Sequence, residues 1–238
     1  MIVTYTEEGW SIILQRSHGL LAGQICGHWK RSKQPERWVE TLIATAEHDD
    51  VSNELNSSDL LTQSGGPKNF KANKFNKEEC DHLLARAIEK GLYVALLIAR
   101  HVTFLYGKEP SAKTYFAALK KREKEWIRQT KTTSEEIAAS YELVEFCDAM
   151  SLLICQDLIQ PEERKIEIST GPGGAHYELW KRDDQHLIVS PWPFEEDSFT
   201  ANYETRSIAQ LAFKNDTEFK EILESSEVTL MSLKISKD

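Results

Sequence analysis

The sequence predicts an α+β fold: a mainly α-helical bundle with a small antiparallel β-sheet built from the N-terminal hairpin and the C-terminal region. Two observations carry this prediction. The middle of the chain repeats apolar residues at helical spacing, whereas both ends carry short β-prone runs separated by turn residues. The length of 238 residues fits a single domain, with a hairpin (1–15), a helical core (16–160) and a β-rich C-terminal part (161–238) packed on that core.

The first 50 residues predict a hairpin and two helices. Runs at 2–6 and 10–14 flank a Glu-Glu-Gly turn. One helix follows from near His18, and a second extends from about Pro35 to Asp50. Because Asp50 falls on the apolar stripe of that second pattern, we expect the end of this helix to point into a cleft.

The next segment, 51–76, is polar and predicts a long surface loop. We expect it to close over an anionic ligand through Lys68, Lys71 and Lys74. Helical patterns then cover 77–106, with a break near Gly91, a stretch that begins at Pro110, and a long helix from Ser134 to about residue 160.

The C-terminal part predicts strands and turns. Residues 169–174 are rich in Gly and Pro and predict a turn. The expected strands and one short helix follow, at 177–181, 186–189, 199–208 and 228–235 for the strands and 216–223 for the helix.

The composition excludes some partners. Apolar residues make up 40% of the chain, charged residues 28%, and the formal net charge is -9. A negative field repels nucleic acid and anionic membranes, so we expect neither, although a bound metal would still admit a small anionic substrate. The N-terminus lacks the features of a secretory signal, and the 4 cysteines form no Cys-x-x-Cys pair. We therefore expect a cytoplasmic protein with buried free thiols. Exposed aromatic residues in the β region would support a homodimer.

The residues that point to chemistry interrupt the apolar helical patterns or end them. His48 and Asp49 end the second helix, and His18 and Asp148 lie on apolar stripes. A buried charge is costly unless it is paired or binds a metal. Two imidazoles and two carboxylates suit a divalent ion such as Mn, Fe, Zn or Mg, so we expect His18, His48, Asp49 and Asp148 to be metal ligands.

Two further residues are candidates for catalysis. Asp50, beside the expected ligands, would orient them or act as a base on water, and His101 lies on another apolar helix face. Structural alternatives stay open at this point. A histidine on an apolar face is usually a hydrogen-bonded core residue, and Asp148 would alternatively pair with Arg100.

The order His, His-Asp, His, Asp on successive helices resembles the HD superfamily of metal-dependent phosphohydrolases. The resemblance implies an HD-like helical core in which His18, His48, Asp49 and Asp148 hold a metal. His101 falls where two-metal members often have an additional histidine, and the usual pair of middle histidines is represented by one. The implied activity is hydrolysis of a phosphate ester or nucleotide. The alternative is a non-enzymatic protein that binds a metal or a small ligand.

A second resemblance covers nearly the whole chain. Five segments are similar to landmarks of an uncharacterised, mostly bacterial family, domain of unknown function 3891: 15–23, 46–50, 100–106, 149–155 and 191–194. The chain departs from that family at Val51-Ser52, where Gly-Trp is usual, and at Arg16-Ser17, where Pro-Asp is common. Because the family has no established activity, the resemblance implies a fold and a site but no substrate.

Overall fold

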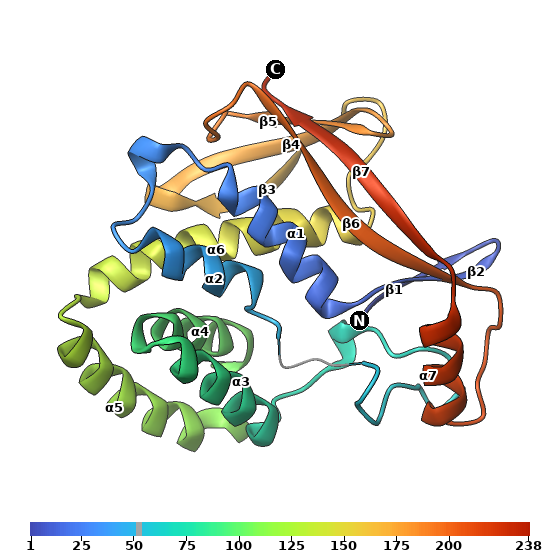
Figure 1. Cartoon of the computed structure of the whole chain (residues 1–238), viewed down its shortest axis with the longest axis horizontal. Coiled ribbons are helices and arrows are strands. Elements are labelled where there is room, and N and C mark those ends of the chain that lie inside the picture. The colour runs from blue at the N-terminus through green and yellow to red at the C-terminus, as the bar shows by residue number, and fades with distance from the viewer. Residues whose placement is uncertain (51–53) are drawn as a thin grey trace.

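The structure is a computed structural model that describes residues 1–50 and 54–238. Its helices gather beneath and inside a curled β-sheet (Figure 1). The helices are α1 (Gln15–Gly27), α2 (Trp38–Ala46), α3 (Lys77–Lys90), α4 (Leu92–Tyr106), α5 (Lys113–Thr130), α6 (Ser134–Cys155) and α7 (Asp216–Ser225). The strands are β1 (Ile2–Thr6), β2 (Gly9–Ile13), β3 (Ile166–Gly171), β4 (Ala175–Asp183), β5 (His186–Ser190), β6 (Ser198–Ile208) and β7 (Val228–Ser236).

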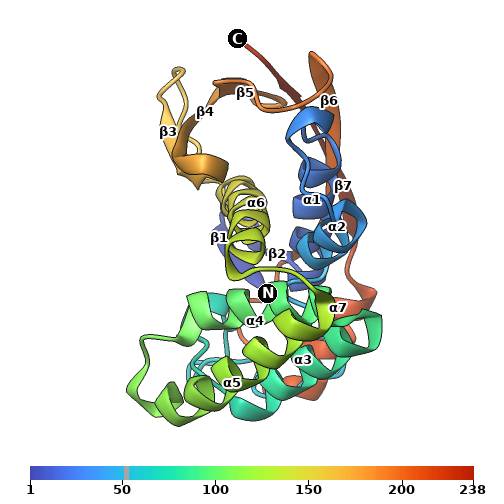
Figure 2. The same ribbon diagram turned by 90° about the vertical axis from the view of Figure 1, so that its left-hand side faces the viewer.

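The strands form one 7-stranded sheet in the order β1-β2-β6-β7-β5-β4-β3. Neighbouring strands are antiparallel except β5 and β7, which are parallel. The sheet curls so that its two ends face each other with α6 between them (Figure 2). A large apolar core fills the space between this sheet and helices α1 and α6. As expected, the N-terminal hairpin joins the C-terminal strands, because β2 pairs with β6.

The predicted fold class, a small antiparallel sheet on a mainly helical, HD-like bundle, is wrong. The sheet is mixed, curled and large enough to enclose a helix. The physical reason is the parallel pairing of His186–Ile188 with Lys234–Ser236, which joins the β3-β4-β5 meander to the strands β1, β2 and β6 through β7. These two segments lie far apart in the sequence, so the hydrophobic pattern within each strand does not indicate that they pair. Part of the segment predicted as a turn, 169–171, belongs to β3.

Local sequence explains where the helices begin and end. Asn76 caps α3, and Thr133 and Glu136 form a capping box at the start of α6. Gly91 separates α3 from α4 at a positive φ of 138°. Helix α2 ends at Ala46, earlier than predicted, so the residues from 47 to 50 follow it in a turn.

Helices α1 and α2 approach each other closely because α1 presents two glycines to Ala46. A Cβ atom on Gly19 would lie 2.8 Å from the carbonyl oxygen of Ala46, and one on Gly23 would lie 2.8 Å from its Cβ. Any larger residue would separate the helices. This contact brings His18 on α1 next to the turn that follows α2.

The described part of the polar segment, 54–76, packs against its surroundings. The backbone N–H groups of Asp59 and Leu60 donate to the carboxylate of Asp216 at the start of α7, and Asn69 bonds to β1. Residues 51–53, which include the Val51-Ser52 departure, lie outside the described residues. All 4 cysteines are buried free thiols. Across the described chain, each helix is too short or too polar to cross a membrane.

Candidate metal centre

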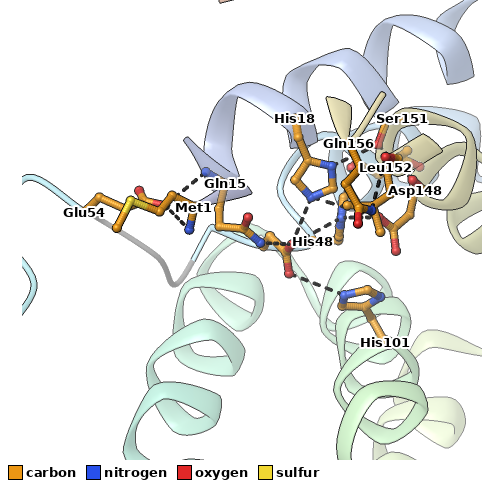
Figure 3. Close-up of polar contacts among 12 residues, drawn as sticks. Met1, Gln15, His18, His48, Glu54, His101, Asp148, Ser151, Leu152 and Gln156 are labelled. Atoms are coloured by element: carbon orange, nitrogen blue, oxygen red, sulfur yellow. Dashed lines mark hydrogen bonds and ion pairs between the residues drawn. The ribbon is translucent and has the colours of Figure 1, made fainter. Parts of the chain in front are cut away.

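Five of the six predicted site residues meet where α1, α4, α6 and the turn after α2 converge. Figure 3 shows His18, His48, His101 and Asp148 of these five. The five residues form two groups that share His48, and within each group the ligand atoms lie within 4.8 Å of one another. One group is His18, His48 and Asp49, and the other is His48, His101 and Asp148. Between ring centroids, the imidazole of His48 lies 4.9 Å from that of His18 and 4.8 Å from that of His101.

His48 is held by its outer nitrogen and presents the inner one to a carboxylate. Its Nδ1 lies 2.7 Å from the carbonyl oxygen of Thr45. A carbonyl only accepts, so Nδ1 carries a hydrogen. Its Nε2 lies 3.1 Å from Oδ1 of Asp148. A neutral ring would then turn a lone pair toward a carboxylate oxygen, so this contact requires a cation, either a second proton or a metal ion.

His18 repeats this arrangement. The hydroxyl of Ser151 donates its one hydrogen to the carbonyl of Asp148 at 2.8 Å, so it accepts from Nδ1 of His18 at 2.9 Å. The Nε2 of His18 lies 2.9 Å from Oδ2 of Asp49. Both histidines are therefore fixed in the orientation and tautomer that direct Nε2 into the cluster, as is common for metal-bound imidazoles.

His101 approaches from α4 on the opposite side of Asp49. Its Nδ1 lies 3.3 Å from the hydroxyl of Tyr141. Its Nε2 is buried and lies 3.5 Å from Oδ1 of Asp49, at the outer limit of a hydrogen bond, with no closer partner among the described residues. A buried ring nitrogen without a partner is unusual and marks a position where a ligand fits.

The histidines decide the charge states of the cluster. Burial alone would lower the pKa of His48, but the charges of Asp148 and Asp49 outweigh it and raise the pKa to about 9. Burial alone would raise the pKa of Asp49, but His48, His101 and His18 hold it well below its usual value. The pKa of Asp148 is lowered in the same way, against burial, by His48, His101 and His18. Both carboxylates are therefore anionic near neutral pH.

Asp50, the sixth predicted residue, lies outside the cluster. Its Oδ1 is 2.7 Å from Nε of Arg16, and its Oδ2 is 2.9 Å from Nη1 of Arg86. Both guanidinium groups also donate to its backbone carbonyl. Because α2 ends at Ala46, the helical periodicity that placed Asp50 on the apolar stripe does not reach it. Asp50 instead joins this turn to α1 and α3.

Sequence reasoning missed the residues that anchor the cluster. Ser151 lies three positions after Asp148 on α6, and this helical spacing is the one signal that would have indicated it. Gln15 donates from Nε2 to Oδ2 of Asp49 at 2.8 Å and has no distinguishing pattern around it. Thr45 acts through its backbone carbonyl, which no side-chain motif reveals.

Access to the cluster is at Asp49, the most exposed of the five residues. A small pocket there is lined by Asn76, Glu79 and Tyr106. Asn76 and Glu79 also line a larger cavity of about 920 Å³ between the 54–77 segment and α3. Lys68, Lys74 and Lys77 contribute to the wall of that cavity. Of the expected loop lysines, Lys68 also pairs with Asp59, and Lys71 is exposed on a short 3₁₀ helix.

Three imidazoles and two carboxylates, buried together and anchored from outside, define a candidate metal-binding centre between helices. The chain that carries it belongs to the family described as protein of unknown function (DUF3891), whose model matches residues 1–210. The whole cluster lies within the matched range, and the family expected from the five sequence landmarks is confirmed. No curated protein and no solved structure gives a significant match to the chain.

Proposed function

We propose that the protein is a metal-dependent phosphohydrolase that acts on a phosphate ester or nucleotide, with His18, His48, Asp49 and Asp148 as metal ligands. One observation carries the proposal. Two histidines with the hydrogen on Nδ1 each direct Nε2 at a carboxylate oxygen, at 2.9 Å and 3.1 Å. A cation belongs at both contacts, and one divalent ion placed between the two pairs would serve them together.

The donor set fits such an ion. Asp49 and Asp148 bring two negative charges into a buried site, which a divalent cation offsets and neutral imidazoles do not. Imidazole nitrogens suit Zn and Fe, and carboxylate oxygens suit Mn and Mg. Because imidazoles form half of this set and His101 adds a third beside it, we favour a transition metal over Mg. The unpartnered Nε2 of His101 gives the ion, or a second one, a further nitrogen.

A divalent ion bound here would act as a Lewis acid toward a phosphoryl oxygen and lower the pKa of bound water. The chain supplies the remaining functions. Ser151, Thr45 and Tyr141 hold the rings from outside, and Arg16 and Arg86 hold Asp50 and thereby the turn that carries His48 and Asp49. The order of the ligands along the chain, which resembles that of HD-superfamily phosphohydrolases, supports the same chemistry.

An anionic substrate is supported by the surroundings of Asp49. The pocket beside it and the larger cavity share Asn76 and Glu79, so a phosphate group near Asp49 would place its leaving group in that cavity. The cavity wall carries three lysines and three carboxylates, and Lys68 and Lys77 pair with Asp59 and Asp81. Within the described residues, Lys74 is therefore the cavity lysine best suited to contact a phosphate group. A volume of about 920 Å³ accommodates a group as large as a nucleoside.

The test measures metal content and ester hydrolysis on the same preparations. Purified wild-type protein should contain about one transition metal ion per chain and should hydrolyse p-nitrophenyl phosphate or a nucleotide from a panel of mono-, di- and triphosphates. His48→Gln should lose both properties, by more than the roughly 10- to 100-fold typical of residues that only orient a ligand. His176→Gln removes an exposed histidine on β4 and should match the wild type.

Two outcomes would contradict the proposal in different ways. Metal bound without turnover of any ester, under Mn, Fe, Zn or Mg, would indicate the non-enzymatic binding protein instead. Hydrolysis that survives in His48→Gln would show that the activity does not belong to this centre.

A further inference from the structure

Gln15 stands at the first position of α1 and is almost fully buried beside Asp49 (Figure 3). Its side-chain amide can face Asp49 in only one way. The Asp49 carboxylate is anionic and accepts hydrogen bonds, so the Nε2 group must be the one that lies 2.8 Å from Oδ2. The carbonyl oxygen Oε1 then belongs to the other side of the same planar amide.

That oxygen has no partner in the described part of the chain. Five buried side-chain atoms there share this property, and three of them face a charged partner just beyond a good hydrogen bond. Arg100 Nε and Glu123 Oε1 lie 3.4 Å apart, and His101 Nε2 lies 3.5 Å from Oδ1 of Asp49. Of the other two, Gln15 Oε1 belongs to a residue that bonds Asp49, whereas Gln156 bonds its own helix. Buried polar atoms are rarely left without hydrogen bonds in folded proteins. The free acceptor on Gln15, next to a proposed metal ligand, is therefore suited to hold a further group at the centre.

Gln15 Oε1 and His101 Nε2 also differ in chemistry. An imidazole nitrogen is a metal ligand or a donor, whereas an amide oxygen is an acceptor. A metal ion alone would serve His101 and leave Gln15 unexplained unless the amide oxygen also bound it. A group that carries hydrogen, held against the Gln15 amide, satisfies its oxygen. Water and the hydroxyl of a substrate are such groups.

We propose that Gln15 is a positioning residue of the metal centre: its Nε2 fixes the Asp49 carboxylate, and its Oε1 accepts a hydrogen bond from a water molecule or hydroxyl bound beside the metal. The proposal rests on the proposed function, because it takes Asp49 as a metal ligand. It adds an acceptor that selects hydrogen-bearing ligands at this position.

The test compares four proteins, stripped of metal and titrated with Mn²⁺ by calorimetry and with Co²⁺ by visible absorption. Gln15→Met keeps the shape of the side chain and loses both polar atoms, and Gln15→Glu keeps an acceptor but loses the donor to Asp49. Gln156→Met is the matched control, because Gln156 also has a buried unpartnered Oε1 but bonds only to its own helix, at Leu152. The fourth protein is the wild type.

We expect Gln15→Met to bind Mn²⁺ about 10-fold more weakly and to change the Co²⁺ d–d spectrum, which reports the ligands of the ion. Gln15→Glu should retain Mn²⁺ affinity through its added negative charge and still change the Co²⁺ spectrum. Gln156→Met should match the wild type in both. The proposal would be overturned if Gln15→Met had the same Mn²⁺ affinity and the same Co²⁺ spectrum as the wild type. If Gln15→Met does not fold, an unchanged Co²⁺ spectrum in Gln15→Glu would overturn the proposal instead.

The same titrations separate this proposal from the proposed function. Metal binding that depends on Gln15 in a protein without esterase activity would uphold the role of Gln15 and remove the phosphohydrolase. Esterase activity with metal binding independent of Gln15 would do the reverse. A wild type that binds neither Mn²⁺ nor Co²⁺ would overturn both.

Discussion

Helix α6 contributes to two buried regions that follow opposite rules. One face packs Phe146, Cys147 and Met150 into the core beneath the curled sheet, where all three are fully buried among apolar side chains. The other face carries Asp148 and Ser151 into the histidine cluster, where burial is nearly as complete but both side chains are held by hydrogen bonds to imidazoles. A few residues therefore separate a region that stabilises the fold from one that costs stability.

The difference between the regions is electrostatic. Burying an apolar side chain contributes about 1.5 to 3 kcal/mol, whereas burying an ion pair removes two charges from water and often gives no net gain. The apolar face of α6 is stabilised by close packing of side chains that fit together in shape. The polar face is held by hydrogen bonds from each ring and carboxylate, and Gln15 beside Asp49 keeps a buried oxygen without a partner among the described residues. The proposed metal centre gives this costly arrangement a use, and four measurements test the contrast.

The largest effect on stability should come from the apolar face. Phe146→Ala removes a fully buried ring that contacts Trp29 and Tyr177 edge-on or at a tilt. We expect a loss of about 3 to 5 kcal/mol in the free energy of unfolding, measured by urea denaturation of metal-free protein. At temperatures where the variant is folded, its metal stoichiometry should equal that of the wild type. A loss below about 1 kcal/mol would mean that this face is loosely packed.

On the polar face, Asp148→Asn should remove the response to metal. The wild type should gain about 2.7 kcal/mol of stability when the metal concentration is 100 times its dissociation constant. The variant keeps the shape of the side chain but loses a ligand charge, so it should gain almost nothing. Asp157→Asn, at an exposed carboxylate just after the C-terminal end of α6, is the control. An equal metal response in Asp148→Asn would exclude this carboxylate as a ligand.

Without metal, a proton on His48 takes the place of the cation, and this gives a pH dependence. The pKa of His48 is about 9 in the folded protein against an ordinary value of 6.5, so its contribution is complete below pH 6.5 and is lost as pH rises through 9. We expect metal-free protein to lose about 2 to 3 kcal/mol between those pH values. Urea unfolding in chelator should show this, and His48→Gln should abolish most of it. Stability that rises over this range would contradict the assignment.

The sequence carried enough information for the cluster because buried charges stand out against apolar helical stripes. His18, His101 and Asp148 are predicted on that ground, and His48 and Asp49 because they follow the end of an apolar helical pattern. The structure brings their side chains together. The prediction for Asp50 is wrong because α2 ends early, at Ala46. The carboxylates of Asp49 and Asp50 therefore lie in different surroundings, and that of Asp50 pairs with Arg16. Helix ends depend on local capping and tertiary contacts, so periodicity locates them poorly.

The sheet was harder to predict than the site. Each strand after residue 174 was recognised within a few residues, as was the N-terminal hairpin. The pairing of β5 with β7 was not, and this pairing turns two small antiparallel groups into one curled sheet. Strand partners are chosen by long-range packing, here around α6, and not by the strands' own composition. The Gly19 and Gly23 spacing on α1 also passed unnoticed, although it sets the distance between two ligand-bearing segments.

That spacing leads to the smallest of the expected effects and the one that links the two regions. Gly19→Ala would place a Cβ 2.8 Å from the carbonyl oxygen of Ala46 and 4.0 Å from Cε1 of His48. Backbone cannot move aside without shifting α1, so we expect a loss of about 1 to 2 kcal/mol in stability together with weaker metal binding. Gly27→Ala on the same helix meets nothing within 4 Å and should be neutral or stabilising by about 0.5 to 1 kcal/mol, with metal affinity unchanged. Calorimetric titration and urea unfolding of the two variants measure both quantities. If Gly19→Ala lowers stability but leaves metal affinity intact, the α1–α2 contact supports only the fold, and the cluster is positioned by its hydrogen bonds to α6 and Thr45 alone.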